Sequence, residues 1–237
     1  MKGTIYMIPC PIADGESVWE VLPKANLEII NSLDYFVVEN IRSARRFLSK
    51  AGIERKIDEL EFVELNEHTT SQSDIERMLR PIVEGRSAGV ISEAGVPGVA
   101  DPGADIVALA HKHDIRVIPL VGPSSIIMSL MASGQNGQSF AFVGYLPVKE
   151  PDRTRHIRSL EQRALSEHSA QIFIEAPYRN IKLMEALIKS LKPSIRLTVA
   201  CDITSKDEYI KTMRVDEWRK VQMPNIEKRP TIFILGI

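Results

Sequence analysis

Residues 92–103 read SEAGVPGVADPG and form the most informative loop of this 237-residue chain. The loop follows AGVIS at residues 88–92, an apolar run typical of a buried strand, and precedes a helical pattern over residues 104–113. Glycines let a backbone approach a ligand closely, and ligands of open parallel sheets bind beyond the carboxyl ends of the strands. A tight strand-to-helix turn with Asp101 as helix cap explains the same residues equally well, so both interpretations stay open.

Short apolar strands alternate with helical patterns on both sides of this loop. We expect strands at residues 3–9, 34–39, 62–65, 88–92, 116–120, 139–144, 170–175, 196–201 and 231–236. We expect helices at residues 18–33, 42–51, 74–84, 104–113, 180–191 and 215–221. This alternation predicts an α/β protein with right-handed crossovers and mainly parallel sheets. Two α/β domains are expected, residues 1–120 with the glycine-rich loop and residues 121–237.

Composition and charge argue against several classes of protein. No apolar run approaches the roughly 20 residues that span a bilayer, so no membrane association is expected. The net charge of −1 lacks the strongly basic signature of a protein that binds nucleic acid with its whole surface. Cys10 and Cys201 form no CxxC or Cys/His cluster, so we expect no disulfide framework, no metal site and a cytoplasmic location. The phosphate-binding patterns GxxxxGK[ST] and GxGxxG are absent, which argues against kinases, GTPases and dinucleotide dehydrogenases.

A second loop, VGPSS at residues 121–125, lies between an expected strand and an expected helix of small and apolar residues. Ser124 and Ser125 would therefore lie at a helix N-terminus, where free amides and hydroxyls can hold a carboxylate or hydroxyl of a ligand. A plain serine cap explains this loop as well. The two loops together favour a ligand site more than either does alone.

Seven blocks in this order and spacing resemble the tetrapyrrole-methylase-like superfamily of S-adenosylmethionine methyltransferases. Within it, they resemble the branch that methylates a cytidine ribose 2′-oxygen in small-subunit ribosomal RNA. The blocks span essentially the whole chain: GTIYMIPCPIADG, VVENIRSARRFL, SEAGVPGVADPG, RVIPLVGPSS, FVGYLP, IFIEAPYRN and TIFILGI. The resemblance implies two α/β domains with a donor-binding trough between them, S-adenosylmethionine as cofactor, and a homodimer.

The resemblance also implies which residues bind the methyl donor. They are Pro11, Gly95, Val96, Val99, Ser124, Ser125, Glu175 and Ile203. The chain departs from the ribosomal RNA branch in its first two loops, where it has PIADGES and Glu39-Asn40-Ile41-Arg42, and at Glu93 and Val96 in the third. The methyl donor is therefore indicated more firmly than the acceptor.

A ribose hydroxyl is a poor nucleophile, so a general base would accelerate its methylation. The candidate catalytic residues are Glu39, His68 in the polar loop LNEHTT, and Glu93, although each could equally be a solvated or capping group. RNA phosphates would need a local basic patch. The candidates for it are Arg42, Arg45, Arg46, Arg153, Arg155, His156, Arg158 and Arg179. A solvated helix face explains the same charges, and Tyr178 could stack on a base or pack in the core.

Three hypotheses follow for the function. The first is a methyltransferase acting on a ribose 2′-oxygen of ribosomal RNA, and the second is a methyltransferase for a tetrapyrrole or another small molecule. The third is a noncatalytic protein that binds the donor or RNA. An RNA enzyme should lose acceptor affinity steeply with salt, whereas a noncatalytic protein should bind the donor without producing S-adenosylhomocysteine.

Overall fold

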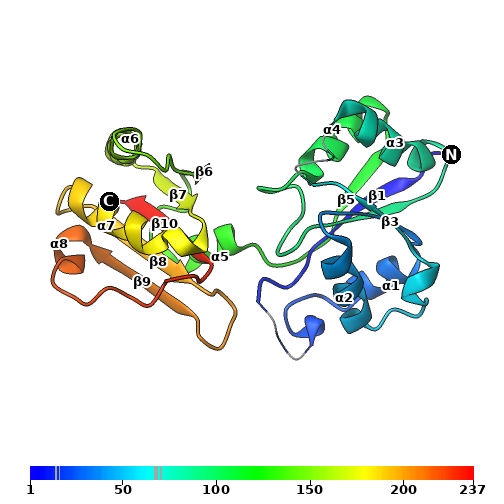
Figure 1. The fold of residues 1–237 in the computed structure, drawn as a ribbon, viewed down its shortest axis with the longest axis horizontal. Coiled ribbons are helices and arrows are strands. Elements are labelled where there is room, and N and C mark those ends of the chain that lie inside the picture. The colour runs from blue at the N-terminus through cyan, green and yellow to red at the C-terminus, as the bar shows by residue number, and fades with distance from the viewer. Residues whose placement is uncertain (14, 16, 67–68, 70) are drawn as a thin grey trace. The chain divides into compact units, whose positions relative to one another are not determined.

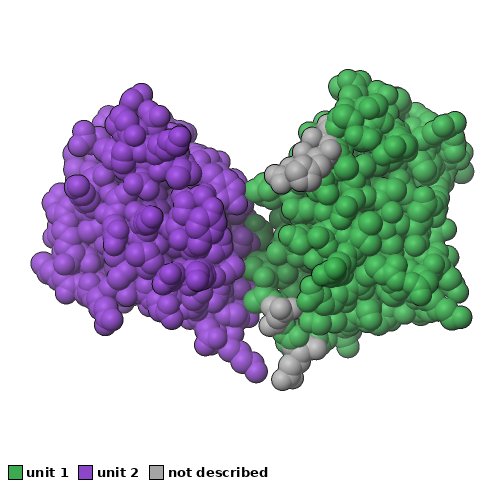
Figure 2. All heavy atoms as spheres, in the orientation of Figure 1, with its two compact units in different colours: residues 1–124 green, residues 125–237 purple. Residues whose placement is uncertain are grey.

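The computed structural model describes residues 1–13, 15, 17–66, 69 and 71–237. The chain divides into two compact units, Met1–Ser124 and Ser125–Ile237 (Figures 1 and 2). The boundary expected from the sequence lies between residues 120 and 121. Among the described residues, no helix has the length and apolar character needed to cross a membrane.

The first unit contains a five-stranded parallel sheet in the order β3-β2-β4-β1-β5. Its strands are β1 (Thr4–Ile8), β2 (Tyr35–Val38), β3 (Glu61–Glu64), β4 (Ala88–Ile91) and β5 (Arg116–Pro119). Its helices are η1 (Val18–Glu20), α1 (Ala25–Asn31), α2 (Ile41–Ala51), η2 (Ile57–Glu59), α3 (Gln72–Val83) and α4 (Gly103–Lys112). The parallel α/β arrangement expected for this half of the chain is confirmed.

Both faces of this sheet are covered, as the alternating side chains of β2 demonstrate. Tyr35 and Val37 pack against α3 and α4, whereas Phe36 and Val38 pack against α1 and α2. Gly89 on the central strand β4 leaves room for this packing, because a Cβ there would lie 2.6 Å from Cδ1 of Ile8 and 2.8 Å from Cδ1 of Phe36. The buried faces thus hold the strand ends in a fixed register.

After the neighbouring strands β1 and β4, the chain crosses to opposite faces of the sheet. The connection after β1 contains α1 on one face, and the connection after β4 contains α4 on the other. Such a reversal is a topological switch point, where the loops beyond the carboxyl ends separate and ligands of open α/β sheets bind. The loop at residues 92–103 starts at this point.

The second unit also contains a five-stranded sheet, in the order β6-β7-β10-β8-β9. Its strands are β6 (Phe140–Tyr145), β7 (Ala170–Ile174), β8 (Arg196–Cys201), β9 (Tyr209–Arg214) and β10 (Thr231–Gly236). Its helices are α5 (Ser125–Ser133), α6 (Asp152–Glu167), η3 (Pro177–Arg179), α7 (Asn180–Ser190) and α8 (Val215–Trp218). The α/β class is confirmed here too, but the sheet is mixed.

The expectation of mainly parallel strands needs a correction in this sheet. β6 and β7 are parallel, whereas β7–β10, β10–β8 and β8–β9 are antiparallel pairs. β8 passes to β9 through a short loop without a helix, so the two strands run in opposite directions. The sequence analysis missed β9 because its residues, YIKTMR, are only partly buried and lack a continuous apolar pattern.

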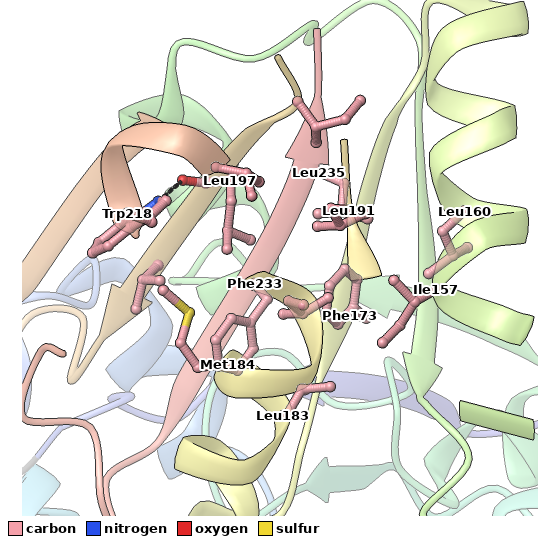
Figure 3. Close-up of a cluster of buried hydrophobic side chains, with 14 of the residues drawn as sticks. Ile157, Leu160, Phe173, Leu183, Met184, Leu191, Leu197, Trp218, Phe233 and Leu235 are labelled. Atoms are coloured by element: carbon pink, nitrogen blue, oxygen red, sulfur yellow. Dashed lines mark hydrogen bonds between the residues drawn. The ribbon is translucent and has the colours of Figure 1, made fainter. Parts of the chain in front are cut away.

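Helices cover both faces of the second sheet. Phe173 and Phe233 stack with ring centroids 5.8 Å apart, and Trp218 Nε1 donates to the carbonyl oxygen of Leu197 over 2.9 Å, within the core against α6, α7 and α8 (Figure 3). On the opposite face, Leu130 of α5 packs against Ile234 of the central strand. This packing fixes the strand ends from which the second unit's predicted site residues extend.

Candidate functional site

Three loops of the first unit come together beyond the carboxyl ends of β1, β4 and β5. The amide of Cys10 donates to the carbonyl of Gly95 over 2.8 Å, and the amide of Gly95 donates back over 3.1 Å. A Cβ on Gly122 would lie 2.3 Å from the ring of Pro9, and one on Gly95 would lie 3.4 Å from the carbonyl oxygen of Pro123. Glycine therefore permits the close approach of the segments that carry Pro11, Gly95 and Ser124.

The loop at residues 92–103 is held by its own aspartate. Both carboxylate oxygens of Asp101 accept from the amide of Gly98 at 2.9 Å, and Oδ1 also accepts from the amide of Gly103 at 2.7 Å. The loop is thus the expected strand-to-helix turn, in which Asp101 binds the first amide of α4, although the N-cap residue of that helix is Pro102 and has no side-chain cap bond. Val96 is half-buried, and Val99 is 47% exposed.

A cavity of about 640 Å³ lies at the carboxyl ends of β2, β3 and β4. Glu39 and Asn40 reach it from the end of β2, Glu64 from the end of β3, and Glu93 from the loop after β4. The complete lining is Glu39, Asn40, Glu64, Asn66, Glu93, Ala100, Asp101 and Pro102. Four carboxylates thus face one space, and the sequence analysis had identified two of them.

Hydrogen bonds from main-chain amides and one hydroxyl hold these carboxylates. Oε2 of Glu39 accepts from the amide of Glu93 at 3.0 Å, and Oε1 of Glu93 accepts from the hydroxyl of Ser43 at 3.1 Å. Oε1 of Glu64 accepts from the amide of Ile41 at 3.3 Å. Within the described part of the chain, none of the four forms an ion pair with a lysine or arginine, so no described basic side chain compensates their negative charge.

The environment of Glu39 shifts its pKa. Burial raises its pKa above the ordinary value, the negative charges of Asp101 and Glu93 raise it further, and the hydrogen bond from the Glu93 amide opposes them. The structure thus brings together the predicted bases Glu39 and Glu93. The third candidate, His68, lies outside the described residues. Across the described residues, no group of three or more His, Cys, Asp and Glu side chains could hold a metal ion.

In the second unit, two predicted site residues bind each other. Oε1 of Glu175, which is 5% exposed, accepts from Nε of Arg179 at 2.9 Å and from the amide of Ala176 at 2.7 Å. Nη1 of Arg179 donates to the hydroxyl of Tyr178 over 2.6 Å, and its guanidinium lies 4.9 Å from that ring's centroid. The bonds to Glu175 raise the pKa of Arg179. Arg179 therefore neutralises the predicted donor residue Glu175.

The remaining donor residues of the second unit differ in exposure. Ile203 is only 4% exposed and packs with Leu130 and Ile232, so its side chain belongs to the core. A ligand would meet the main chain at this position. Ser125 is the first residue of α5 and is half-buried.

The predicted basic residues fall into two groups with different partners. On α2, Arg42 and Arg46 are exposed one turn apart and form no ion pair with any described residue, whereas Arg45 binds Asp58. On α6, Arg153 pairs with Glu150 and Arg155 with Asp152, at 2.9 and 3.1 Å. Arg158 is exposed and has no ion pair with a described residue. The α2 group is therefore the less compensated one.

The sequence analysis missed Glu64 as a cavity residue and Ser43 as a support. Glu64 was detectable, because it lies at the carboxyl end of an expected strand next to β2. Ser43 was not, because its role depends on contact with Glu93, which lies 50 residues away in the sequence.

No family model matches the chain. Curated proteins, in contrast, are similar to it in sequence. The Ribosomal RNA small subunit methyltransferase I of Escherichia coli O157:H7 is 28% identical over 91% of this chain and 71% of its own length. The enzyme of the same name from Mesorhizobium japonicum is 28% identical over 90% and 67%, and that of Xylella fastidiosa is 33% identical over 75% and 60%.

Solved structures share the fold at low sequence identity. The methyltransferase CobJ has a TM-score of 0.64 at 16% identity, covering 99% of this chain and 94% of its own. A uroporphyrin-III C-methyl transferase from Thermus thermophilus, complexed with S-adenyl homocysteine, has a TM-score of 0.52 at 16% identity, covering 99% and 97%. The resemblance predicted from the ordered blocks is confirmed: the chain is similar in sequence to enzymes named Ribosomal RNA small subunit methyltransferase I, and it shares the fold of CobJ and of the uroporphyrin-III C-methyl transferase. The chain is an S-adenosylmethionine-dependent methyltransferase.

Proposed function

We propose that this methyltransferase transfers the methyl group of S-adenosylmethionine to a ribose 2′-oxygen of small-subunit ribosomal RNA. We propose further that it acts in the cytoplasm as a homodimer. The observation that carries the choice of acceptor is the cavity in which Glu39, with its raised pKa, lies beside the loop at residues 92–103. The names of the curated relatives support ribosomal RNA as the substrate.

The loops of the first unit fit a bound donor. Gly95 has a φ of +70° and Gly98 one of +81°, so the loop adopts a backbone conformation that residues with side chains rarely adopt and packs its main chain against the neighbouring segments at Pro123 and Met7. The residues that would hold the donor are Pro11, Gly95, Val96, Val99, Ser124, Ser125, Glu175 and Ile203. The donor supplies a methyl group already activated by its sulfonium charge. The protein's main task is then to position the reacting atoms, which can contribute on the order of 7 to 11 kcal/mol.

Glu39 is the proposed general base. It would accept the proton of the ribose 2′-hydroxyl, while the amide of Glu93 fixes its carboxylate through the bond to Oε2. A positioned base typically contributes roughly 10² to 10⁴ in rate. Glu93 would orient Glu39 through this amide, and its own carboxylate is held by Ser43.

The charges around the cavity distinguish between acceptors. Four carboxylates would repel an acceptor rich in carboxylates, such as a uroporphyrin, whereas sugar hydroxyls and base amines can donate hydrogen bonds to them. RNA phosphates would bind instead to Arg42 and Arg46 on α2, the helix capped by the cavity residue Asn40. This distribution favours RNA over a tetrapyrrole.

Transfer of radiolabel from S-adenosylmethionine tests this proposal. The acceptors are small ribosomal subunits and total RNA from a strain that lacks the gene, and the labelled nucleotide is then mapped. We expect label at one position of small-subunit RNA, with Glu39→Gln as the inactive control. Binding of the donor without label in either acceptor would refute the proposal.

A further inference from the structure

The loop that follows β8, at residues 202–208, has a strained backbone. Asp202 has a φ of +48° and Thr204 one of +71°. Aspartate adopts this left-handed region comparatively often, whereas β-branched threonine rarely does, so the strain lies at Thr204. Ile203 lies between them with its side chain buried in the core. Strain of this kind persists only where surrounding contacts impose it, and it is often found at binding sites.

Within the loop, the amide of Thr204 donates to Oε2 of Glu208 over 2.8 Å, and the two ends of the loop are bound by Arg229, in the segment before β10. Nε of Arg229 donates to Oδ2 of Asp202 over 2.7 Å, and Nη2 donates to the carbonyl of Asp207 over 2.6 Å. Nη1 donates to the carbonyl of Asn225 over 2.6 Å, which anchors the side chain to its own segment. One guanidinium therefore spans the loop from its beginning to near its end.

The same segment, residues 224–230, also binds the chain that follows β7. The amide of Lys228 donates to the carbonyl of Pro177 over 3.0 Å. Nδ2 of the fully buried Asn180 donates to the carbonyls of Ile226 and Arg229 over 3.1 and 2.7 Å. Residues 224–230 thus brace two loops, one carrying Glu175 and the other carrying Ile203.

We infer that Arg229 is a positioning residue of the donor site, which holds the 202–208 loop in the backbone conformation that the methyl donor requires at Ile203. The inference rests on the proposed function, because Ile203 is a donor residue only there. Without Arg229 the loop relaxes toward unstrained conformations. Donor binding must then restore the strained conformation, which weakens the affinity.

Titration of the full-length protein with S-adenosylhomocysteine tests this role. We expect Arg229→Met to raise the dissociation constant about tenfold, the equivalent of one strained residue. Arg229→Lys should fall between this variant and the wild type, because a lysine can bind Asp202 without reaching Asp207. The matched control is Arg214→Met, which also removes an ion pair with an aspartate but lies at the opposite end of β9.

The following measurements distinguish the positioning role of Arg229 from a purely structural one. Positioning through Asp202 requires that Asp202→Asn weaken donor affinity and that the double variant with Arg229→Met be no weaker than the single variant Arg229→Met. It also requires a rise in the KM for the donor with little change in kcat. Unchanged affinity in both Arg229→Lys and Asp202→Asn would overturn the inference, even if Arg229→Met does not fold. Failure of the wild type to bind S-adenosylhomocysteine would instead count against the proposed function.

Discussion

The strand-end loops of the two units reach the left-handed backbone region by different means. In the first unit, Gly95 and Gly98 occupy it, and glycine does so without steric cost. In the second, Asp202 and Thr204 occupy it; Arg229, 27 residues away, binds the carboxylate of Asp202, and Glu208 binds the amide of Thr204. The first arrangement is intrinsic to the loop, whereas the second depends on a brace.

The carboxylates at the strand ends show a similar contrast. Burial raises the pKa of Glu39, which follows β2, and the negative charges of Asp101 and Glu93 in the same cavity raise it further, although the hydrogen bond from the Glu93 amide opposes them. Glu175, after β7, is buried against the guanidinium of Arg179. An acid with raised proton affinity suits proton transfer, whereas an ion-paired acid suits a fixed structural or binding role.

The largest expected effect is on the rate of methyl transfer, and it distinguishes Glu39 from Glu175. We expect Glu39→Gln to lower the single-turnover rate of methyl transfer by roughly 10² to 10⁴ with little change in donor affinity. In the wild type the rate should fall on acidification at a higher pH than for an ordinary glutamate, because the raised pKa protonates the base sooner. Glu175→Gln should keep this acid limb. A Glu39→Gln variant with the wild-type pH profile would contradict the assignment.

A smaller effect is expected where glycine permits close packing in the first unit. Gly122→Ala places a Cβ 2.3 Å from the ring of Pro9 and should lower the free energy of unfolding by about 1 to 3 kcal/mol. Donor affinity should fall as the loops after β1 and β5 separate. Gly137→Ala is the control, since nothing lies within 4 Å of its added Cβ. Thermal or chemical unfolding measures the difference, and equal stability of the two variants would disprove the close approach.

The smallest expected effect is on the free energy of unfolding, and its sign differs between Gly98→Ala in the first unit and Thr204→Gly in the second. Gly98→Ala forces alanine to a φ of +81° and should destabilise the protein by about 1 to 2 kcal/mol. Thr204→Gly relieves about 1 to 3 kcal/mol of strain, less about 0.5 to 1 kcal/mol for the added chain entropy. It should therefore leave the protein equally or more stable. Equal destabilisation by both substitutions would show that Thr204 stores no strain.

The sequence predicted best what local patterns determine. Apolar periodicity predicted the two-domain α/β class and the parallel first sheet, and glycine marked the loop at residues 92–103. Glu39 ends one expected strand and Glu93 directly follows another. β8 and β10 were predicted as strands, but their antiparallel direction was not, because strand direction depends on which neighbour a strand pairs with. β9 was missed as a strand.

Within the site, the side-chain contacts that only the fold brings together could not be predicted from the sequence. The pairing of Glu175 with Arg179 removed one arginine from the expected basic patch, although both residues had been singled out separately. Arg229 gave no signal in the sequence, because its role depends on Asp202 and Asp207. Side-chain braces of this kind become visible only in the folded chain.

The chemical stability of the labelled RNA tests the central claim most directly. A methyl group on a ribose 2′-oxygen blocks alkaline cleavage of the adjacent phosphodiester, whereas a methyl group on a base does not. We predict that, after transfer from labelled S-adenosylmethionine to small ribosomal subunits and complete alkaline hydrolysis, the label is recovered in alkali-stable dinucleotides. Recovery of the label in mononucleotides would contradict ribose methylation.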